Sequence, residues 1–171
     1  MIILVGPDGT GKSTLTTDLQ QSYIHYDQYT TYEQFLEPLV NQNAWDMVFD
    51  RNCFCEIVYH KLMKRPFRFT SKQWHNLVQL TLAYRPVIVL CTYHQPKETY
   101  PDDQYLPHEK LEECLQLYKD FFAKENIPYI EYDFANYHLN DPDAANTEEY
   151  NGFVDDLCLL YLRSCICRRT F

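Results

Sequence analysis

Residues 6–13 read Gly-Pro-Asp-Gly-Thr-Gly-Lys-Ser, and this stretch decides how the rest of the chain is interpreted. It fits the pattern G-x-x-x-x-G-K-[S/T], in which glycines let backbone N–H groups converge on phosphate oxygens. The apolar run Ile2–Val5 precedes it with the length of a buried strand, and Lys12–Gln21 follows with a helical pattern. Strand, glycine-rich turn and helix in this order predict a phosphate-binding loop for a nucleoside triphosphate.

The loop also suggests roles for individual side chains. Lys12 is expected to reach the β- and γ-phosphates, and the Ser13 hydroxyl is expected to bind Mg²⁺. The motif indicates the nucleotide but not the reaction. The predicted nucleotide-binding residues are Gly6, Asp8, Gly9, Thr10, Gly11, Lys12, Ser13 and Thr14.

Strand and helix patterns alternate along the rest of the chain. Further apolar runs of strand length are Tyr23–Tyr26, Met47–Asp50, Val87–Cys91 and Ile127–Tyr132. Helical spacing is found in Lys12–Gln21, Tyr32–Asn41, Asn52–Lys64, the segment between Ser71 and Arg85, His108–Lys124 and Phe153–Cys165. Polar loops are expected at Tyr93–Pro107 and Ala135–Tyr150. The alternation predicts an α/β fold of three layers, with a parallel sheet covered by helices on both faces. A chain of 171 residues has the length of one domain, so a single domain over residues 1–171 is expected.

Two local features of these helices carry expectations of their own. Ser71 is the expected N-cap of the helix that follows it. Pro38 lies within the pattern of Tyr32–Asn41, where a proline predicts a kink or an early end of the helix.

The charge of the chain limits its partners. The net charge is −9, which argues against a broad surface for duplex nucleic acid or anionic membranes, because lysine and arginine bind phosphate backbones. A local basic pocket stays open, since residues 61–68 hold two lysines and two arginines, although a solvated helix face is the plainer interpretation. No apolar run approaches the roughly 18 residues of a membrane span.

The cysteines indicate the compartment. There are 7 of them, an odd number. The pairs Cys53/Cys55 and Cys165/Cys167 are spaced C-x-C and lack the spacing of structural zinc sites. The first five residues are too short for a signal peptide and lack a basic region. Free thiols in a reducing, cytoplasmic environment are therefore expected.

A second motif lies at the end of the strand Met47–Asp50. Asp50 followed by Arg51 offers a carboxylate for a metal ion or a proton transfer, and a guanidinium for a phosphate. The plainer alternative is a surface ion pair at a strand end.

At these two motifs the sequence resembles the thymidylate kinase and deoxynucleoside kinase family. The family's phosphate loop commonly reads G-x-D-G-x-G-K-[S/T], matched by residues 6–13. Its second signature is an Asp-Arg or Glu-Arg after a strand, followed by a helix that often holds a tyrosine, matched by Asp50, Arg51 and Tyr59. The order of elements is similar over nearly the whole chain.

The resemblance implies a five-stranded parallel sheet of order 2-3-1-4-5 and phosphoryl transfer from ATP with Mg²⁺. It implies that Asp8 faces the sugar of the acceptor, that Asp50 lies near the metal or the attacking group, and that Arg51 holds the acceptor. Arg68 lies roughly where relatives supply another ligand of the acceptor phosphate. Trp74 is either a stacking partner for a base or a core residue, and the loop around residues 136–143 is expected to contact adenine.

The sequence departs from the family in its arginines. Relatives place a catalytic arginine either in the phosphate loop, where this chain has Gly9, or in the lid, Tyr93–Pro107. Lys97 is the only lysine or arginine of that lid, which makes it the remaining catalytic candidate beside Lys12, Asp50 and Arg51. Cys55 stands where serine is usual. The compact chain is typical of phage or viral relatives.

The expected function is phosphorylation of a deoxynucleoside monophosphate, most of all dTMP or a modified pyrimidine analogue. A deoxynucleoside kinase and a kinase of a modified base in DNA are the enzymatic alternatives. A slow nucleotide-dependent switch and a degenerate kinase kept for protein interaction are the others. Nucleotides are the expected partners, and a homodimer stays open.

Overall fold

The computed structural model describes residues 1–171 apart from 42, 94–105, 135–147 and 167–171. Strands and helices alternate along it, as expected. The strands are β1 (Ile2–Val5), β2 (Ser22–His25), β3 (Met47–Asp50), β4 (Val87–Thr92) and β5 (Ile130–Asp133). The helices are α1 (Lys12–Asp18), α2 (Tyr32–Val40), α3 (Cys53–Leu62), α4 (Ser71–Ala83), α5 (Leu111–Lys124) and α7 (Glu148–Ile166), with 3₁₀ turns at η1 (Asn43–Asp46) and η3 (His108–Lys110).

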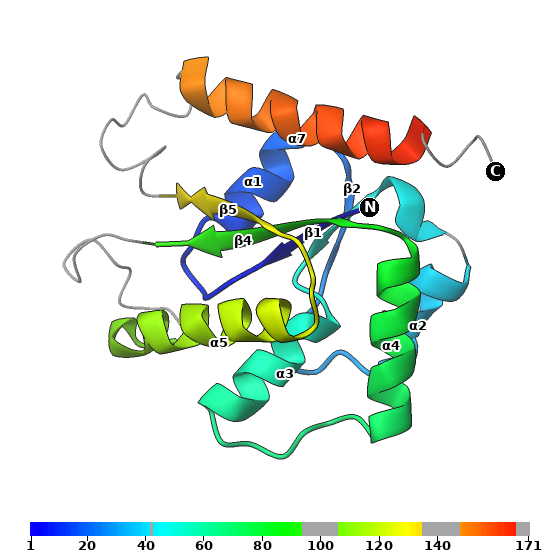
Figure 1. Cartoon of the computed structure of the whole chain (residues 1–171), viewed down its shortest axis with the longest axis vertical. Coiled ribbons are helices and arrows are strands. Elements are labelled where there is room, and N and C mark those ends of the chain that lie inside the picture. The colour runs from blue at the N-terminus through cyan, green and yellow to red at the C-terminus, as the bar shows by residue number, and fades with distance from the viewer. Residues whose placement is uncertain (42, 94–105, 135–147, 167–171) are drawn as a thin grey trace.

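The five strands form one parallel sheet of order β2-β3-β1-β4-β5 (Figure 1). In its centre Leu4 lies beside Asp50 of β3 on one side and Val89 of β4 on the other. The predicted order is therefore confirmed. Because all strands run the same way, their carboxyl ends meet at one edge, where the loops after β1 and β3 come together.

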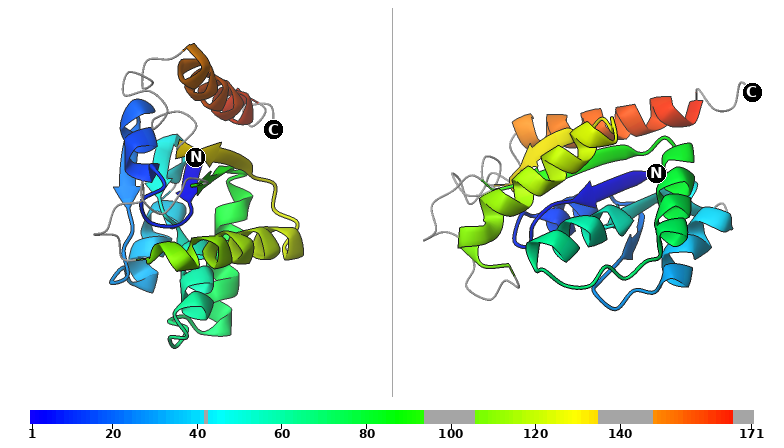
Figure 2. Two further views of the ribbon diagram at one scale, coloured as in Figure 1. Left: turned by 90° about the vertical axis from the view of Figure 1, so that its left-hand side faces the viewer. Right: turned by 60° about the horizontal axis from the view of Figure 1, so that its bottom comes forward.

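Helices cover both faces of the sheet, which gives three layers (Figures 1 and 2). α1 and α7 lie on one face, where Leu15, Leu157 and Tyr161 pack with the strand residues Leu4 and Val89. The other face is covered by α2, α3, α4 and α5. Its core includes Ile3, Val5, Phe49, Phe35, Phe54, Leu77 and Phe122. Near-continuous apolar strands are what burial on both faces requires.

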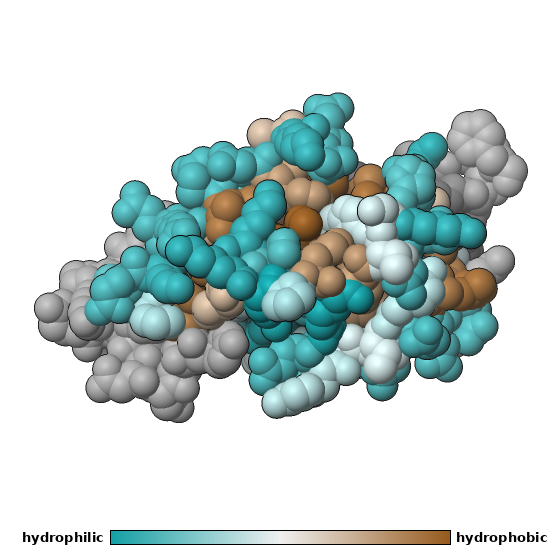
Figure 3. Space-filling view, turned by 90° about the horizontal axis from the view of Figure 1, so that it is seen from below, coloured by the Kyte–Doolittle hydropathy of each residue, from teal (hydrophilic) through white to brown (hydrophobic). Residues whose placement is uncertain are grey.

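The outer surface of this second helical layer is largely hydrophilic, with apolar residues showing between polar ones (Figure 3). No helix in the described part of the chain combines the length and hydrophobicity needed to cross a bilayer.

The N-cap of α4 differs from the expectation, and a proline lies inside α2. Thr70, not Ser71, caps α4: its side chain accepts from the N–H of Gln73, and the Gln73 side chain accepts from the N–H of Thr70. Pro38 lies inside α2 without ending it at once. Pro38 has no N–H to donate to the Gln34 carbonyl. That carbonyl instead accepts a hydrogen bond from the Tyr26 hydroxyl at 3.3 Å.

Candidate active site

The loop between β1 and α1 has a backbone that only glycine adopts without strain. Gly6, Gly9 and Gly11 have φ values of 136°, 73° and 74°. A Cβ at Gly6 would lie 2.2 Å from the carbonyl oxygen of Cys91, and one at Gly11 would lie 2.0 Å from the ring of Phe134. The tight packing around the loop therefore requires glycine at both positions.

Lys12 is buried against the inside of this loop. Its Nζ donates to the carbonyl oxygen of Gly6 at 3.1 Å and to that of Pro7, and it lies 3.5 Å from Oγ1 of Thr10. Within the described part of the chain these neutral groups are its hydrogen-bond acceptors. The loop thus encloses an ammonium group whose charge fits an anionic phosphate.

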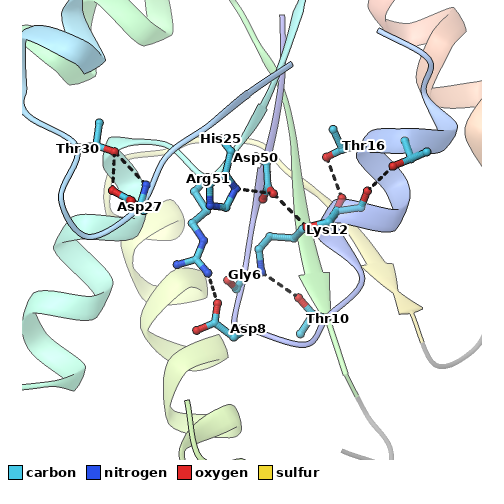
Figure 4. Close-up of polar contacts among 12 residues, drawn as sticks. Gly6, Asp8, Thr10, Lys12, Thr16, His25, Asp27, Thr30, Asp50 and Arg51 are labelled. Atoms are coloured by element: carbon cyan, nitrogen blue, oxygen red, sulfur yellow. Dashed lines mark hydrogen bonds and ion pairs between the residues drawn. The ribbon is translucent and has the colours of Figure 1, made fainter. Parts of the chain in front are cut away.

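Asp50 ends β3 and is 3% exposed (Figure 4). Its Oδ2 accepts from Oγ of Ser13 at 3.2 Å and from Nδ1 of His25 at 2.9 Å. Its Oδ1 is buried and has no hydrogen-bond partner among the described residues. A buried carboxylate oxygen beside a serine hydroxyl fits a hard cation such as Mg²⁺.

No group of three histidine, cysteine or acidic side chains that could hold a metal ion by itself occurs among the described residues. Magnesium sites at nucleotides need fewer protein ligands, because the phosphates and waters supply the rest. Ser13 and Asp50 therefore match a cation bound together with a nucleotide better than a permanent metal centre.

Arg51 follows Asp50 in a left-handed conformation, with φ of 74°. Such a backbone costs a non-glycine residue about 1–3 kcal/mol and is typical of functional sites. It is fixed by a hydrogen bond from the Arg51 N–H to the Leu4 carbonyl at 2.9 Å. The guanidinium forms an ion pair with Asp8 and lies 6.0 Å from the ring centre of Tyr59. Burial lowers its pKa and the Asp8 carboxylate raises it, with a net upward shift.

Two cavities meet at these residues. The loop pocket has a volume of about 340 Å³ and is lined by Asp8, Gly9, Gly11, Lys12, Ser13, Thr14, His25, Asp50, Arg51 and Phe134. The arginine pocket has a volume of about 200 Å³ and is lined by Asp8, His25, Tyr26, Asp27, Gln28, Phe35, Arg51, Asn52, Cys55, Glu56, Tyr59 and Arg65. Asp8, His25 and Arg51 belong to both, so they separate the two cavities.

A buried carboxylate holds one wall of the arginine pocket. Glu56 of α3 lies 3.0 Å from Arg65 and 3.0 Å from Arg68, both in the connection to α4. Arg68 also donates to the carbonyl oxygens of Gln28 and Thr30 in the loop after β2. The structure thus places Arg68 as a link between two loops, while Arg65 is the arginine of this pair that lines the cavity.

The remaining predicted residues lie apart from this centre or outside the described chain. Trp74 packs against the rings of Phe67 and Phe121, with ring centres 5.4 and 6.0 Å apart, and lines neither pocket. Lys97 and the region expected to contact adenine, 136–143, fall outside the described residues.

The cysteines near the site are free thiols in the described part of the chain, as expected. Cys55 reaches the arginine pocket, and burial raises its pKa. Burial also raises the pKa of Cys91, beneath the loop, to about 12. Protonated thiols are poor nucleophiles, which argues against covalent catalysis by these groups.

The sequence patterns missed His25, Glu56 and Phe134, and they indicated Arg65 only as one member of the basic run 61–68. His25 could have been found, because it ends β2 and the carboxyl ends of parallel strands share an edge. The contact of Glu56 with Arg65 depends on how the connection between α3 and α4 folds back. No local pattern indicates it.

Comparisons with known proteins show what this arrangement resembles. No protein-family model and no curated sequence matches the chain. Among solved structures, the YorR protein from Bacillus subtilis in complex with phosphorylated GDP has a TM-score of 0.61 at 19% identity, over 93% of this chain and 94% of its own. Deoxyadenosine kinase from M. mycoides with bound dCTP has a TM-score of 0.46 at 13% identity, over 96% of this chain and 100% of its own. The likeness to YorR is a likeness of fold, and with the strand order it shows that this chain has the three-layer P-loop NTPase fold.

Proposed function

We propose that the chain is a single kinase domain that transfers a phosphoryl group from ATP, with Mg²⁺, to a deoxynucleoside monophosphate such as dTMP or a modified pyrimidine analogue. The observation that carries the proposal is the pair of adjoining cavities that share Asp8, His25 and Arg51. A donor in one and an acceptor in the other would meet at these side chains. Positioning two substrates in this way is the main task of a phosphotransferase.

The loop pocket suits the donor nucleotide. Lys12 supplies a buried positive charge and the loop supplies backbone N–H groups, which together hold the phosphates. The fold-sharing YorR protein was solved with a phosphorylated GDP, which supports a nucleotide ligand here as well.

A magnesium ion bound with the nucleotide would be held by Ser13 and Asp50, and it would neutralise charge on the transferred phosphoryl group. The buried Oδ1 of Asp50 supports this assignment, because it has no other partner among the described residues. Asp8, which lines both pockets, places a second carboxylate where donor and acceptor would meet.

The arginine pocket suits the acceptor. Arg51 and Arg65 both line this small cavity, and one guanidinium can bind two phosphate oxygens at once. Tyr59, whose buried hydroxyl has no hydrogen-bond partner among the described residues, offers a donor or acceptor for the sugar.

A deoxynucleoside acceptor is the second candidate, favoured by the charge of the arginine pocket. Its lining holds three carboxylates, from Asp8, Asp27 and Glu56, against two guanidiniums, from Arg51 and Arg65. Each of these guanidiniums is already paired with a carboxylate. A neutral sugar hydroxyl would enter such a pocket without the repulsion that a phosphate dianion meets.

The test is ADP formation from Mg·ATP with a panel of acceptors: deoxynucleosides, their monophosphates and duplex DNA. Turnover with monophosphates, highest for a pyrimidine, is the expected result. Turnover with deoxynucleosides alone would replace the proposal by the second candidate. Turnover only with DNA, or no turnover despite nucleotide binding, would contradict both and favour a DNA-base kinase or a switch protein.

A further inference from the structure

We propose that His25 is a positioning residue that orients the Asp50 carboxylate toward the cation bound with the nucleotide. The inference rests on the proposed function for the presence of that cation. Its basis is the contact between Nδ1 of His25 and Oδ2 of Asp50, 2.9 Å long (Figure 4). An outer hydrogen bond of this kind fixes how a ligating side chain faces its metal.

The sheet itself brings the two side chains together. His25 and Asp50 are register partners at the carboxyl ends of β2 and β3. The Tyr26 N–H donates to the Asp50 carbonyl at 3.0 Å, which continues the pairing past the end of β2. Partners in register point to the same face of a sheet, so the contact follows from the backbone and needs no distortion.

The hydrogen bond has a defined direction. A carboxylate accepts and does not donate, so Nδ1 of His25 carries the hydrogen. Oδ2 of Asp50 then accepts from His25 and from the Ser13 hydroxyl at 3.2 Å. Two donors on one oxygen fix the rotation of the carboxylate and leave Oδ1, which has no partner among the described residues, available to the cation.

Packing does not explain this histidine. Its side chain is 50% exposed, whereas that of Asp50 is 4% exposed. A half-exposed side chain at the end of an edge strand contributes little to the core, so its removal is expected to leave the fold intact. What it does contribute is a directed hydrogen bond to a buried carboxylate at the site.

Three substitutions separate positioning from direct action on a substrate. His25→Ala removes both ring nitrogens. The side-chain amide of His25→Asn lies close to the place of Nδ1 and can still donate to Asp50, whereas that of His25→Gln lies near the place of Nε2. His75→Ala is the matched control, because His75 is an exposed histidine on α4.

The measurement is the affinity for Mn²⁺ in the presence of the non-hydrolysable ATP analogue AMP-PNP, followed by electron paramagnetic resonance without any acceptor. We expect binding of Mn²⁺ to weaken about 10- to 100-fold in His25→Ala. His25→Asn and His75→Ala should bind Mn²⁺ about as well as the wild type, whereas His25→Gln should bind it as weakly as His25→Ala. Wild-type affinity in His25→Ala would overturn the inference, and so would rescue by glutamine but not by asparagine.

The same experiment separates this inference from the proposed function. The binding measurement contains no acceptor. A loss of Mn²⁺ binding in His25→Ala therefore supports the positioning role even if the turnover assay finds no acceptor that is phosphorylated. A wild-type chain that binds no Mn²⁺·AMP-PNP would overturn the inference and the proposed function together.

Discussion

The loop pocket and the arginine pocket share Asp8, His25 and Arg51 but are built in different ways. Most of the loop pocket comes from one continuous stretch, residues 8–14, to which β2 adds His25, the end of β3 adds Asp50 and Arg51, and the residue after β5 adds Phe134. The arginine pocket is assembled from residues 8, 25–28, 35, 51, 52, 55, 56, 59 and 65. The first is therefore a local structure that one motif encodes, and the second is a product of the tertiary fold.

The charges of the two pockets differ in the same way. Lys12 contacts neutral carbonyl and hydroxyl oxygens, so its charge is kept for a ligand. In the arginine pocket Arg51 is paired with Asp8, and Arg65 with Glu56. An anionic ligand there has to compete with a carboxylate for the guanidinium, or bind to a guanidinium that is already paired. We therefore expect the arginine pocket to discriminate between ligands more strongly than the loop pocket.

The largest effect is expected from Lys12→Ala. Removal of the buried ammonium should lower kcat by at least about 10²-fold, because a preorganised positive charge on the transferred group is lost. The measurement is ADP formation at saturating Mg·ATP. Lys72→Ala, an exposed lysine on α4, is the control and should leave kcat unchanged. Near-normal turnover in Lys12→Ala would remove the loop pocket from the mechanism.

Gly11→Ala should act through geometry instead of charge. The new Cβ would lie 2.0 Å from the ring of Phe134, on a backbone with φ of 74°. The loop must shift, and a displacement of about 1 Å can cost about 10²-fold in rate. We expect weaker AMP-PNP binding by calorimetry and reduced turnover.

Gly152→Ala provides the matched control for this change. Apart from the neighbouring backbone of its own helix, no atom of the described residues lies within 4 Å of its added Cβ, and Gly152 is inside α7. Alanine there should raise stability by about 0.5–1 kcal/mol and leave nucleotide binding unchanged. If Gly11→Ala bound AMP-PNP as well as Gly152→Ala does, the loop would not need its tight packing.

Asp50→Asn is expected to lower kcat by at least about tenfold, the range of a lost acid–base or metal contact. Asparagine keeps the volume of the side chain but removes a negative charge beside the phosphates, so the affinity for AMP-PNP without metal should not fall. The apparent affinity for Mg²⁺, measured as the dependence of rate on its concentration, should fall. An unchanged rate and unchanged Mg²⁺ dependence would contradict the proposed role.

Glu56→Gln is expected to have the smallest effect on rate and to separate the two pockets. It removes the charged partner that Arg65 and Arg68 share, which should cost about 1–3 kcal/mol of stability. Because Glu56 lines only the arginine pocket, the KM for the acceptor should rise while the KM for ATP stays constant. A parallel rise of both values would show that the two pockets are not independent.

The order and kind of the elements were predictable because the patterns are strong. The glycine motif lies between a strand and a helix, and the buried strands are apolar on both faces. The strand order came from the resemblance of the two motifs to a kinase family, and the sheet confirms it.

The boundaries were less predictable, and Ile127 shows why. The apolar run suggested a strand from Ile127, but β5 begins at Ile130. Asn126 takes a left-handed conformation with φ of 52°, and the Ile127 N–H donates to the Phe122 carbonyl at 2.8 Å. Ile127 thus belongs to the C-terminal cap of α5, a use of an apolar residue that its pattern does not reveal.

For the site the limit is tertiary contact. The sequence indicated the loop residues, Asp50 and Arg51, because each lies in a motif, and the structure brings them together at one edge of the sheet. It did not indicate the contact of Glu56 with Arg65, since that contact depends on the path of residues 63–70. The resemblance implies that Arg68 lies roughly where relatives bind the acceptor phosphate, whereas in the structure it lines neither pocket and ties that path to the loop after β2.

The central claim is that the two pockets hold a donor and an acceptor between which a phosphoryl group moves. The most direct measurement follows the label from [γ-³²P]ATP in the presence of Mg²⁺ and dTMP. We expect the label to appear in dTDP, and to appear at least about 10²-fold more slowly with Lys12→Ala. Label found only as inorganic phosphate, at a rate independent of every deoxynucleoside and deoxynucleotide supplied, would contradict it.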